Sequence, residues 1–163
     1  MGMMKIMPYS GIGMVGGNKF ELSEGSTKIM LDFGRALGIE QLYRLSNMNL
    51  SELYKRISLG ICPKIKGIYR KDLLAKTDIP PHKEVAFDGI VYSHSHLDHI
   101  GDMYLCDDDI EHYVAPATFW GIKSYENVLR TLANTEFTSY RKKPKNGLPL
   151  QYFQYLGPYQ LTR

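Results

Sequence analysis

The chain has 163 residues, of which 44% are hydrophobic and 23% are charged. This length suits one domain and is too short for two ordinary ones, and the composition is that of a globular protein rather than a disordered or fibrous one. The formal net charge of +3 is compatible with an anionic substrate but does not require one.

The cysteines and the N-terminal residues bear on the cellular compartment in which the protein is expected. Cys62 and Cys106 lie far apart in the sequence and cannot build a disulfide framework, which is typical of a reducing environment. Lys5 and Pro8 interrupt the Met-rich start, so we expect neither a signal peptide nor a membrane-spanning helix. The sequence therefore predicts a cytoplasmic protein without a membrane partner. We expect Cys106 to be a half-buried thiol rather than a metal ligand.

The first part of the chain predicts an antiparallel meander. Residues 3–9 and 19–22 read as strands on either side of a glycine-dense connection, and a hairpin turn at 24–26 leads into a returning strand over 28–34. No Gly-Lys-Ser/Thr follows the glycines and a strand comes next, so we do not expect a phosphate-binding loop.

Residues 35–86 predict a helical insertion. Leu50, Leu53, Tyr54 and Ile57 recur at three- and four-residue spacing, which predicts an amphipathic helix over about 49–58. A second short helix is expected at 68–74.

Four basic residues lie in this insertion, namely Lys64, Lys66, Arg70 and Lys71. They suit either a track for a phosphate backbone or an ordinary solvated face.

An apolar run at 87–93 predicts the central strand of the sheet, and residues 111–115 predict the next strand. Pro116 at a first helical position predicts a helix through about Leu132. The three aspartates at 107–109 read as a solvated turn, and we expect His112 to be structural or exposed.

The chain divides into residues 1–133 and a basic, aromatic C-terminal segment, 134–163. This last segment could use its basic and aromatic side chains to bind nucleic acid, but an ordinary tail is the favoured interpretation.

The central strand leads directly into residues 93–102, which read SHSHLDHIGD and hold three of the chain's five histidines. If 89–96 is extended, His94 and His96 project to one side about 6.6 Å apart. Asp98 and His99 lie where a helical spacing begins, so we expect their side chains to point in a different direction from those of His94 and His96. They therefore suit a second cation beside the first. Imidazole with carboxylate suits zinc, iron or manganese better than calcium. The alternative is a buried, hydrogen-bonded histidine cluster, in which each polar group needs its own partner.

The run His94-Ser95-His96-Leu97-Asp98-His99 resembles the signature of the metallo-β-lactamase superfamily. The resemblance implies that His94 and His96 bind one metal and that Asp98 and His99 bind another, with Asp98 the candidate catalytic residue. It also implies a fold: the N-terminal half of an αββα sandwich, α/β in class, with a mixed sheet that begins as the antiparallel meander.

The glycine-rich opening followed by Leu31-Asp32-Phe33-Gly34 is similar to the ribonuclease J-like branch, and residues 63–74 are similar to an insertion in its archaeal members. A carboxylate at a strand end can hold a ligand imidazole by its second nitrogen, which is the role we expect for Asp32. Without the resemblance, a simple turn aspartate is the favoured interpretation. The implied function is a zinc-dependent RNA-processing nuclease.

The resemblance also implies later metal ligands, including further histidines, and no histidine follows His112. We therefore expect this chain to hold half of a two-zinc site, with weak, partial or absent occupancy, that a C-terminal half or second chain completes. Two alternatives stay open: a catalytically incomplete binding or assembly partner, and a hydrolase of a small ester, thioester or lactone.

Overall fold

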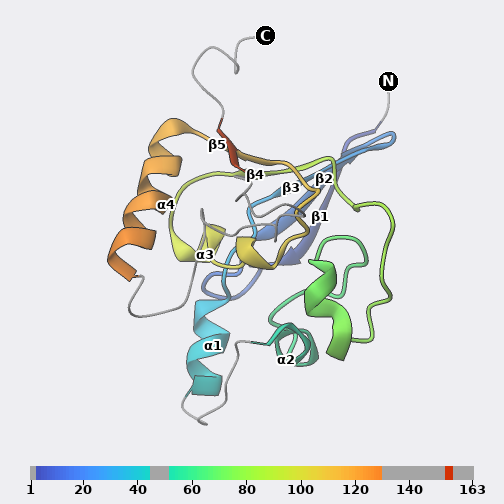
Figure 1. Ribbon diagram of the computed structural model, residues 1–163, viewed down its shortest axis with the longest axis horizontal. Helices are drawn as coiled ribbons and strands as arrows, with labels where there is room; N and C mark the ends of the chain where they lie inside the picture. The colour runs from blue at the N-terminus through green and yellow to red at the C-terminus, as the bar shows by residue number, and fades with distance from the viewer. Residues whose placement is uncertain (1–2, 45–51, 130–152, 156–163) are drawn as a thin grey trace, which may run out of the picture.

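The computed structural model describes residues 3–44, 52–129 and 153–155 (Figure 1). The strands are β1 (Lys5–Ser10), β2 (Lys19–Glu24), β3 (Thr27–Leu31), β4 (Gly89–Tyr92), β5 (His112–Val114) and β6 (Phe153–Tyr155). The helices are α1 (Leu37–Arg44), α2 (Leu53–Ser58), α3 (Leu97–Ile100) and α4 (Pro116–Leu129), with the 3₁₀ helices η1 (Lys71–Lys76) and η2 (Met103–Leu105).

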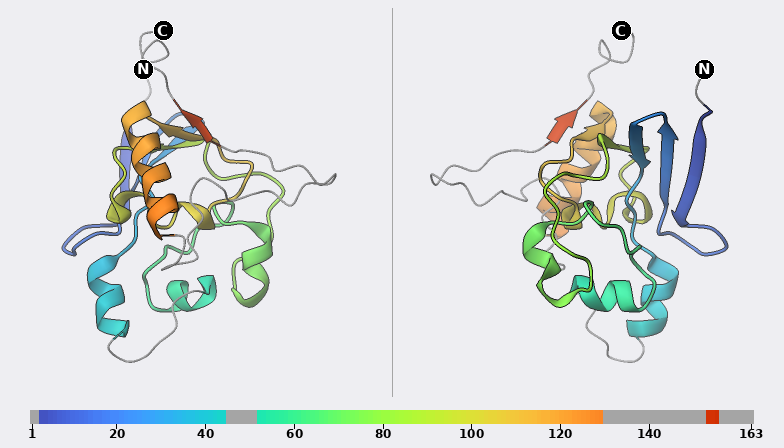
Figure 2. Two further views of the ribbon diagram at one scale, coloured as in Figure 1. Left: turned by 60° about the vertical axis from the view of Figure 1, so that its left-hand side comes forward. Right: turned by 90° about the vertical axis from the view of Figure 1, so that its right-hand side faces the viewer.

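The strands form one mixed sheet in the order β1-β2-β3-β4-β5-β6. Neighbours from β1 to β3 are antiparallel, whereas β3 to β6 run parallel. In Figures 1 and 2, α1, α2 and η1 gather below the sheet, and α4 lies near its β5 end, away from β1. The predicted α/β class with an antiparallel N-terminal meander is confirmed. Within the described ranges no helix is long and apolar enough to cross a membrane.

The meander forms where turn chemistry and alternation predict it. Glu24 pairs with Thr27 across the expected hairpin turn, and Gly25 there has a φ of 59°, a conformation that favours glycine. The returning strand ends at Leu31, because Asp32 takes a φ of 56° and turns the chain away. Few non-glycine residues adopt this conformation, although aspartate is among those that tolerate it.

The central strand is shorter than the predicted 87–93 and covers Gly89–Tyr92. It lies between β3 and β5 in parallel register, with Ile90 opposite both Met30 and His112. Ile90 is fully buried and Tyr92 is 2% exposed. An apolar strand covered on both faces is what a parallel sheet requires.

The helical insertion differs in detail from its prediction. The helix predicted at about 49–58 begins at Leu53, and residues 49–51 lie outside the described part of the chain. The second helix is η1, a 3₁₀ helix displaced toward the C-terminus from the expected 68–74. Helix α1, with the sequence LGIEQLYR, was not predicted.

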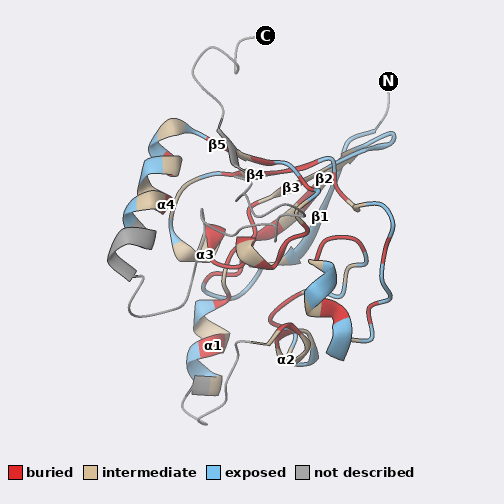
Figure 3. Cartoon of the chain, in the orientation of Figure 1, coloured by how far each residue is buried: buried red, intermediate tan, exposed pale blue. Residues whose placement is uncertain are grey.

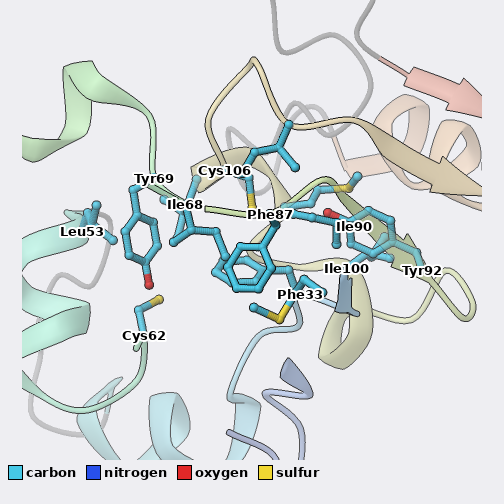
Figure 4. Packing of buried hydrophobic residues seen from close by; sticks show 14 of the residues in the cluster. Phe33, Leu53, Cys62, Ile68, Tyr69, Phe87, Ile90, Tyr92, Ile100 and Cys106 are labelled. Atoms are coloured by element: carbon cyan, nitrogen blue, oxygen red, sulfur yellow. The ribbon is translucent and has the colours of Figure 1, made fainter. Parts of the chain in front are cut away.

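The core joins the sheet to this insertion (Figures 3 and 4). Phe33 lies edge-on to Tyr69, with their ring centroids 6.1 Å apart, and both side chains are fully buried. Figure 3 shows buried residues through the sheet and the connections beneath it, while β1 is exposed along its length. Cys62 and Cys106 are free thiols within this core. The expectation of a half-buried Cys106 is therefore wrong: its exposure is 0%.

The elements after the histidine motif lie mostly where the sequence predicts them. Strand β5 and helix α4 begin within one residue of their predicted starts, and the predicted helix end at Leu132 lies outside the described residues. The aspartates at 107–109 are not uniformly solvated, because Asp107 is 4% exposed and its carboxylate lies 3.0 Å from His82 Nε2. Of the segment 134–163 the structure describes β6, which pairs with β5.

Gly34, which follows β3, packs directly against the backbone of the histidine motif. A Cβ at this position would lie 1.6 Å from the Asp98 carbonyl oxygen, which belongs to backbone. We predict that Gly34→Ala lowers the free energy of unfolding by about 3 kcal/mol or more, since the backbone must move to relieve the overlap. Gly38→Ala in α1 is the matched control, because a Cβ there meets nothing closer than 3.4 Å. Urea denaturation of both variants measures the difference, and equal stability of Gly34→Ala and wild type would contradict this packing.

Candidate metal centre

The histidine motif begins where β4 ends. The strand stops at Tyr92, so residues 93–96 form a loop rather than the extended strand expected over 89–96. The two imidazoles still converge: His94 Nε2 lies 3.1 Å from His96 Nδ1. His94 is half-buried and His96 is exposed, so the pair is accessible from solvent.

This spacing has a direct chemical meaning. Two ligand atoms bound to one tetrahedral zinc ion at about 2.0–2.1 Å lie about 3.3 Å apart. The 3.1 Å between His94 Nε2 and His96 Nδ1 is close to that value. The two nitrogens could therefore share one cation after a small adjustment of the rings.

A second pair comes from the short helix that follows. His96 is the residue before α3, with an extended φ of −70° and ψ of 146°, and Asp98 lies in the first turn. His99 Nε2 lies 3.4 Å from Asp98 Oδ2, again near the spacing of two ligands on one ion. The helix start expected at Asp98 is confirmed to within one residue. The rings of His94 and His99 have centroids 3.9 Å apart, which brings the two pairs together.

Asp32 lies behind this second pair. Its Oδ1 accepts the Ser93 backbone N–H at 2.8 Å, and its Oδ2 lies 2.7 Å from His99 Nδ1. The Ser93 hydroxyl reaches the same carboxylate at 2.9 Å. A proton on His99 Nδ1 directed at Asp32 leaves Nε2 unprotonated, and a metal bound through Nε2 would have to displace the Asn18 amide that lies 3.2 Å from it.

Asn18 also reaches the site, and the sequence analysis did not identify it. Its amide donates to the Asp98 carbonyl at 3.2 Å and lies 3.2 Å from His99 Nε2. Gly16 and Gly17 precede it with φ values of 81° and 78°, which only glycine adopts readily. The glycine-dense connection was the available signal, since it allows the chain to bend toward the motif.

A buried cluster of charges lies at the far end of the motif. Lys19, Glu40, Arg56 and Asp102 are each at most 2% exposed. Asp102 Oδ2 lies 3.0 Å from Lys19 Nζ, and Asp102 Oδ1 lies 2.5 Å from an Arg56 nitrogen. Burial opposes ionisation of this carboxyl, but the two cations outweigh it and lower the pKa of Asp102 below its usual value. Burial, followed by the charge of Asp102, raises the pKa of the neighbouring Cys62 thiol to about 11.

Although the two pairs lie close together, the candidate ligands meet two at a time rather than as one group of three or more. Among the described residues no three His, Cys, Asp or Glu side chains are grouped so that they could hold a metal ion. Two other histidines have separate roles: His82 pairs with Asp107, and His112 stacks on Tyr92 with centroids 5.6 Å apart. Burial lowers the pKa of His112 to about 3, so it is neutral and structural.

The basic residues of the insertion have acidic neighbours. Arg70 lies 2.6 Å from Asp72, Lys71 lies 3.7 Å from Asp109, and Lys64 pairs with Asp78. Three of the four cations considered for a phosphate track are therefore partly neutralised. A phosphate backbone would have to compete with these carboxylates.

Comparison with known proteins supplies a fold but no family. No family model and no curated protein matches the chain. A solved crystal structure of a protein of unknown function from Enterococcus faecalis V583 is similar, with a TM-score of 0.60 and 22% sequence identity. The match covers 77% of this chain and 28% of that one, so the chain spans little more than a quarter of the length of its structural neighbour.

The contact between Asp32 and His99 predicts a particular imidazole tautomer. We expect neutral His99 to carry its proton on Nδ1 in the wild type and to populate the Nε2–H form in Asp32→Gly, which keeps the backbone freedom but removes the acceptor. Loss of the charge-assisted hydrogen bonds should also cost about 1.5–3 kcal/mol of stability. Asp32→Asn tolerates the same φ and retains an acceptor oxygen, so it serves as the control. Long-range ¹H–¹⁵N spectra at pH 8 distinguish the tautomers, and an unchanged His99 in Asp32→Gly would refute the assigned role.

Proposed function

We propose that this chain contributes the first half of the active site of a metal-dependent hydrolase. The observation that carries the proposal is the spacing within the two pairs, 3.1 Å for His94 with His96 and 3.4 Å for Asp98 with His99. A solvent-accessible cluster of three imidazoles and a carboxylate at the end of a central strand favours metal binding over a buried structural cluster. Zinc is the proposed metal, since its ligands include histidine nitrogen and carboxylate oxygen.

Each residue has a defined part in this proposal. A bound zinc would supply a water of lowered pKa and a Lewis acid for the group under attack. His94 and His96 hold one ion, and Asp98 and His99 hold the other. Asp32 fixes the ring of His99 through Nδ1. Asp98, half-buried beside His99, is the candidate catalytic residue because it occupies the aspartate position of the motif that resembles the superfamily signature.

The proposed substrate is an RNA phosphodiester in the cytoplasm. Support comes from the resemblance of the motif, the glycine-rich opening and residues 63–74 to ribonuclease J-like proteins of the metallo-β-lactamase superfamily. The neutralised cations of the insertion weaken a phosphate track at 64–71. A small ester, thioester or lactone needs no such track and remains the alternative substrate class.

Two protein ligands for each ion leave the rest of each coordination shell to water or to other chain segments, whereas zinc sites are usually four-coordinate. This incomplete coordination supports a site that a C-terminal half or a second chain completes. It also leads us to expect weak or partial zinc occupancy in this chain alone.

A second candidate function, a binding or assembly partner without its own catalysis, is favoured by the exposed apolar residues near the N-terminus. They are Met3, Met4, Ile6, Met7, Ile12 and Val15, and each is at least 54% exposed. Exposed apolar groups of this kind mark interaction surfaces in soluble proteins. Strand β1, which carries two of them, is also at the edge of the sheet.

Zinc titration with His96→Ala tests the proposed function. We predict that the wild type binds zinc in the calorimeter and that His96→Ala binds it at least tenfold more weakly, because one nitrogen of the first pair is lost. The matched control is Ser95→Ala in the same loop, whose hydroxyl lies against Gly121 rather than the imidazoles; its affinity should be unchanged. Any cleavage of a labelled RNA that the wild type shows should be lost in His96→Ala.

Two results would count against the hydrolase. The first is a folded wild type that takes up no zinc. The second is equal zinc affinity in wild type and His96→Ala. A folded protein that binds no zinc and self-associates through its N-terminal surface would instead favour the assembly role.

A further inference from the structure

Lys19 is buried in an unusual manner for its residue type. It is 0% exposed at the start of β2, whereas lysines are almost never fully buried unless they are paired. Its ammonium lies 3.0 Å from Asp102 Oδ2, donates to the Gly34 carbonyl and sits 4.9 Å from the centroid of the Phe33 ring. One side chain thus joins the start of β2 to the exit of β3 and to the end of the histidine motif.

The segment that Lys19 contacts carries the second pair of candidate ligands. The backbone of residues 97–102 is hydrogen-bonded to residues 33–35 at three points: Arg35 N to Leu97 O at 2.9 Å, Phe33 N to His99 O at 2.8 Å, and Asp102 N to Phe33 O at 3.0 Å. Asn18 N donates to Asp98 O at 3.1 Å. Lys19 links the two hydrogen-bonded segments, 33–35 and 97–102, because it contacts the Gly34 carbonyl in one and the Asp102 carboxylate in the other.

The charges around Asp102 make this arrangement specific. Arg56 contacts both Asp102, at 2.5 Å, and Glu40, at 2.7 Å, and Glu40 also lies 2.7 Å from Arg35. Removing Lys19 would leave the buried Asp102 with Arg56 as its remaining charged partner among these residues. A buried carboxylate that loses one of its partners pays a large desolvation cost, so the loop that carries it would be expected to shift.

We propose that Lys19 is a positioning residue for the metal centre, holding residues 97–102 so that Asp98 and His99 face His94 and His96. The inference rests on the proposed metal site. Lys19 itself touches none of the four candidate ligands in the contacts described above, and it acts through Asp102 and Gly34. Groups hydrogen-bonded directly to metal ligands commonly change metal affinity by 10–100-fold when they are removed, and Lys19, one contact further away, is expected to act at the lower end of that range.

The test compares Lys19→Met with a control of similar burial. Lys19→Met keeps most of the length of the unbranched side chain and removes its charge. Asp107→Asn weakens the buried His82–Asp107 pair, which lies outside the histidine motif. Both variants should lose stability, and both are measured at a temperature where denaturation curves show them to be folded. We expect Lys19→Met to bind zinc about tenfold or more weakly than wild type, and Asp107→Asn to bind it within twofold of wild type.

A double-mutant cycle separates a positioning effect through Asp102 from a general loss of structural order around the site. If Lys19 acts through Asp102, Lys19→Met combined with Asp102→Asn should weaken zinc binding no more than the stronger single variant. Additive losses, or equal zinc affinities in Lys19→Met and Asp107→Asn, would overturn the proposal.

Metal-free imidazole spectra keep this test independent of the hydrolase proposal. If the wild type binds no zinc, the proposed function fails, and the ¹H–¹⁵N signals of His96 and His99 decide the role of Lys19. Their displacement in Lys19→Met but not in Asp107→Asn would support positioning. Unchanged signals in both variants would overturn it.

Discussion

The close approach of the histidine motif to the exit of β3 is the constraint on which the site depends. Gly34 has no side chain, and this lets the Asp98 carbonyl come to within 1.6 Å of where a Cβ would stand. Hydrogen bonds from Phe33 and Arg35 then hold residues 97–102 against this exit. Asp32 reaches His99 because the chain leaves β3 at Asp32 with a positive φ, just before the residues that hydrogen-bond to the motif. The candidate ligands therefore owe their placement to backbone packing.

Local patterns predicted much of the fold and the core of the site. Alternation with a Gly25 turn predicted the meander, and Pro116 marked the start of α4. The spacing of His94, His96, Asp98 and His99 predicted two close pairs, and the structure shows both distances, although residues 93–96 form a loop rather than the expected strand. The two pairs also lie nearer to each other than the expected separate directions implied. Patterns among residues close in sequence are the ones that side-chain periodicity can predict.

Contacts between distant residues could not be predicted in the same way. Asn18 and Lys19 meet Asp98 and Asp102 across 80 and 83 residues. In β2, Lys19 and Glu21 are buried whereas Phe20 and Leu22 are half-buried, the reverse of what an alternating strand with one buried face normally shows. The inward face of β2 is charged because Lys19 has Asp102 as a partner, a tertiary interaction that outweighs strand patterning. Helix α1 was missed for a related reason, since its buried Glu40 is stabilised by Arg56 and Arg35.

The central claim is that the two close pairs are metal ligands, and diffraction at the zinc absorption edge tests it most directly. Crystals equilibrated with zinc should give an anomalous peak about 2.0–2.1 Å from imidazole nitrogens of both His94 and His96, with a second, weaker peak between Asp98 and His99. Zinc bound only elsewhere, for example at His82 and Asp107, or no ordered zinc in crystals of the folded protein, would contradict the account.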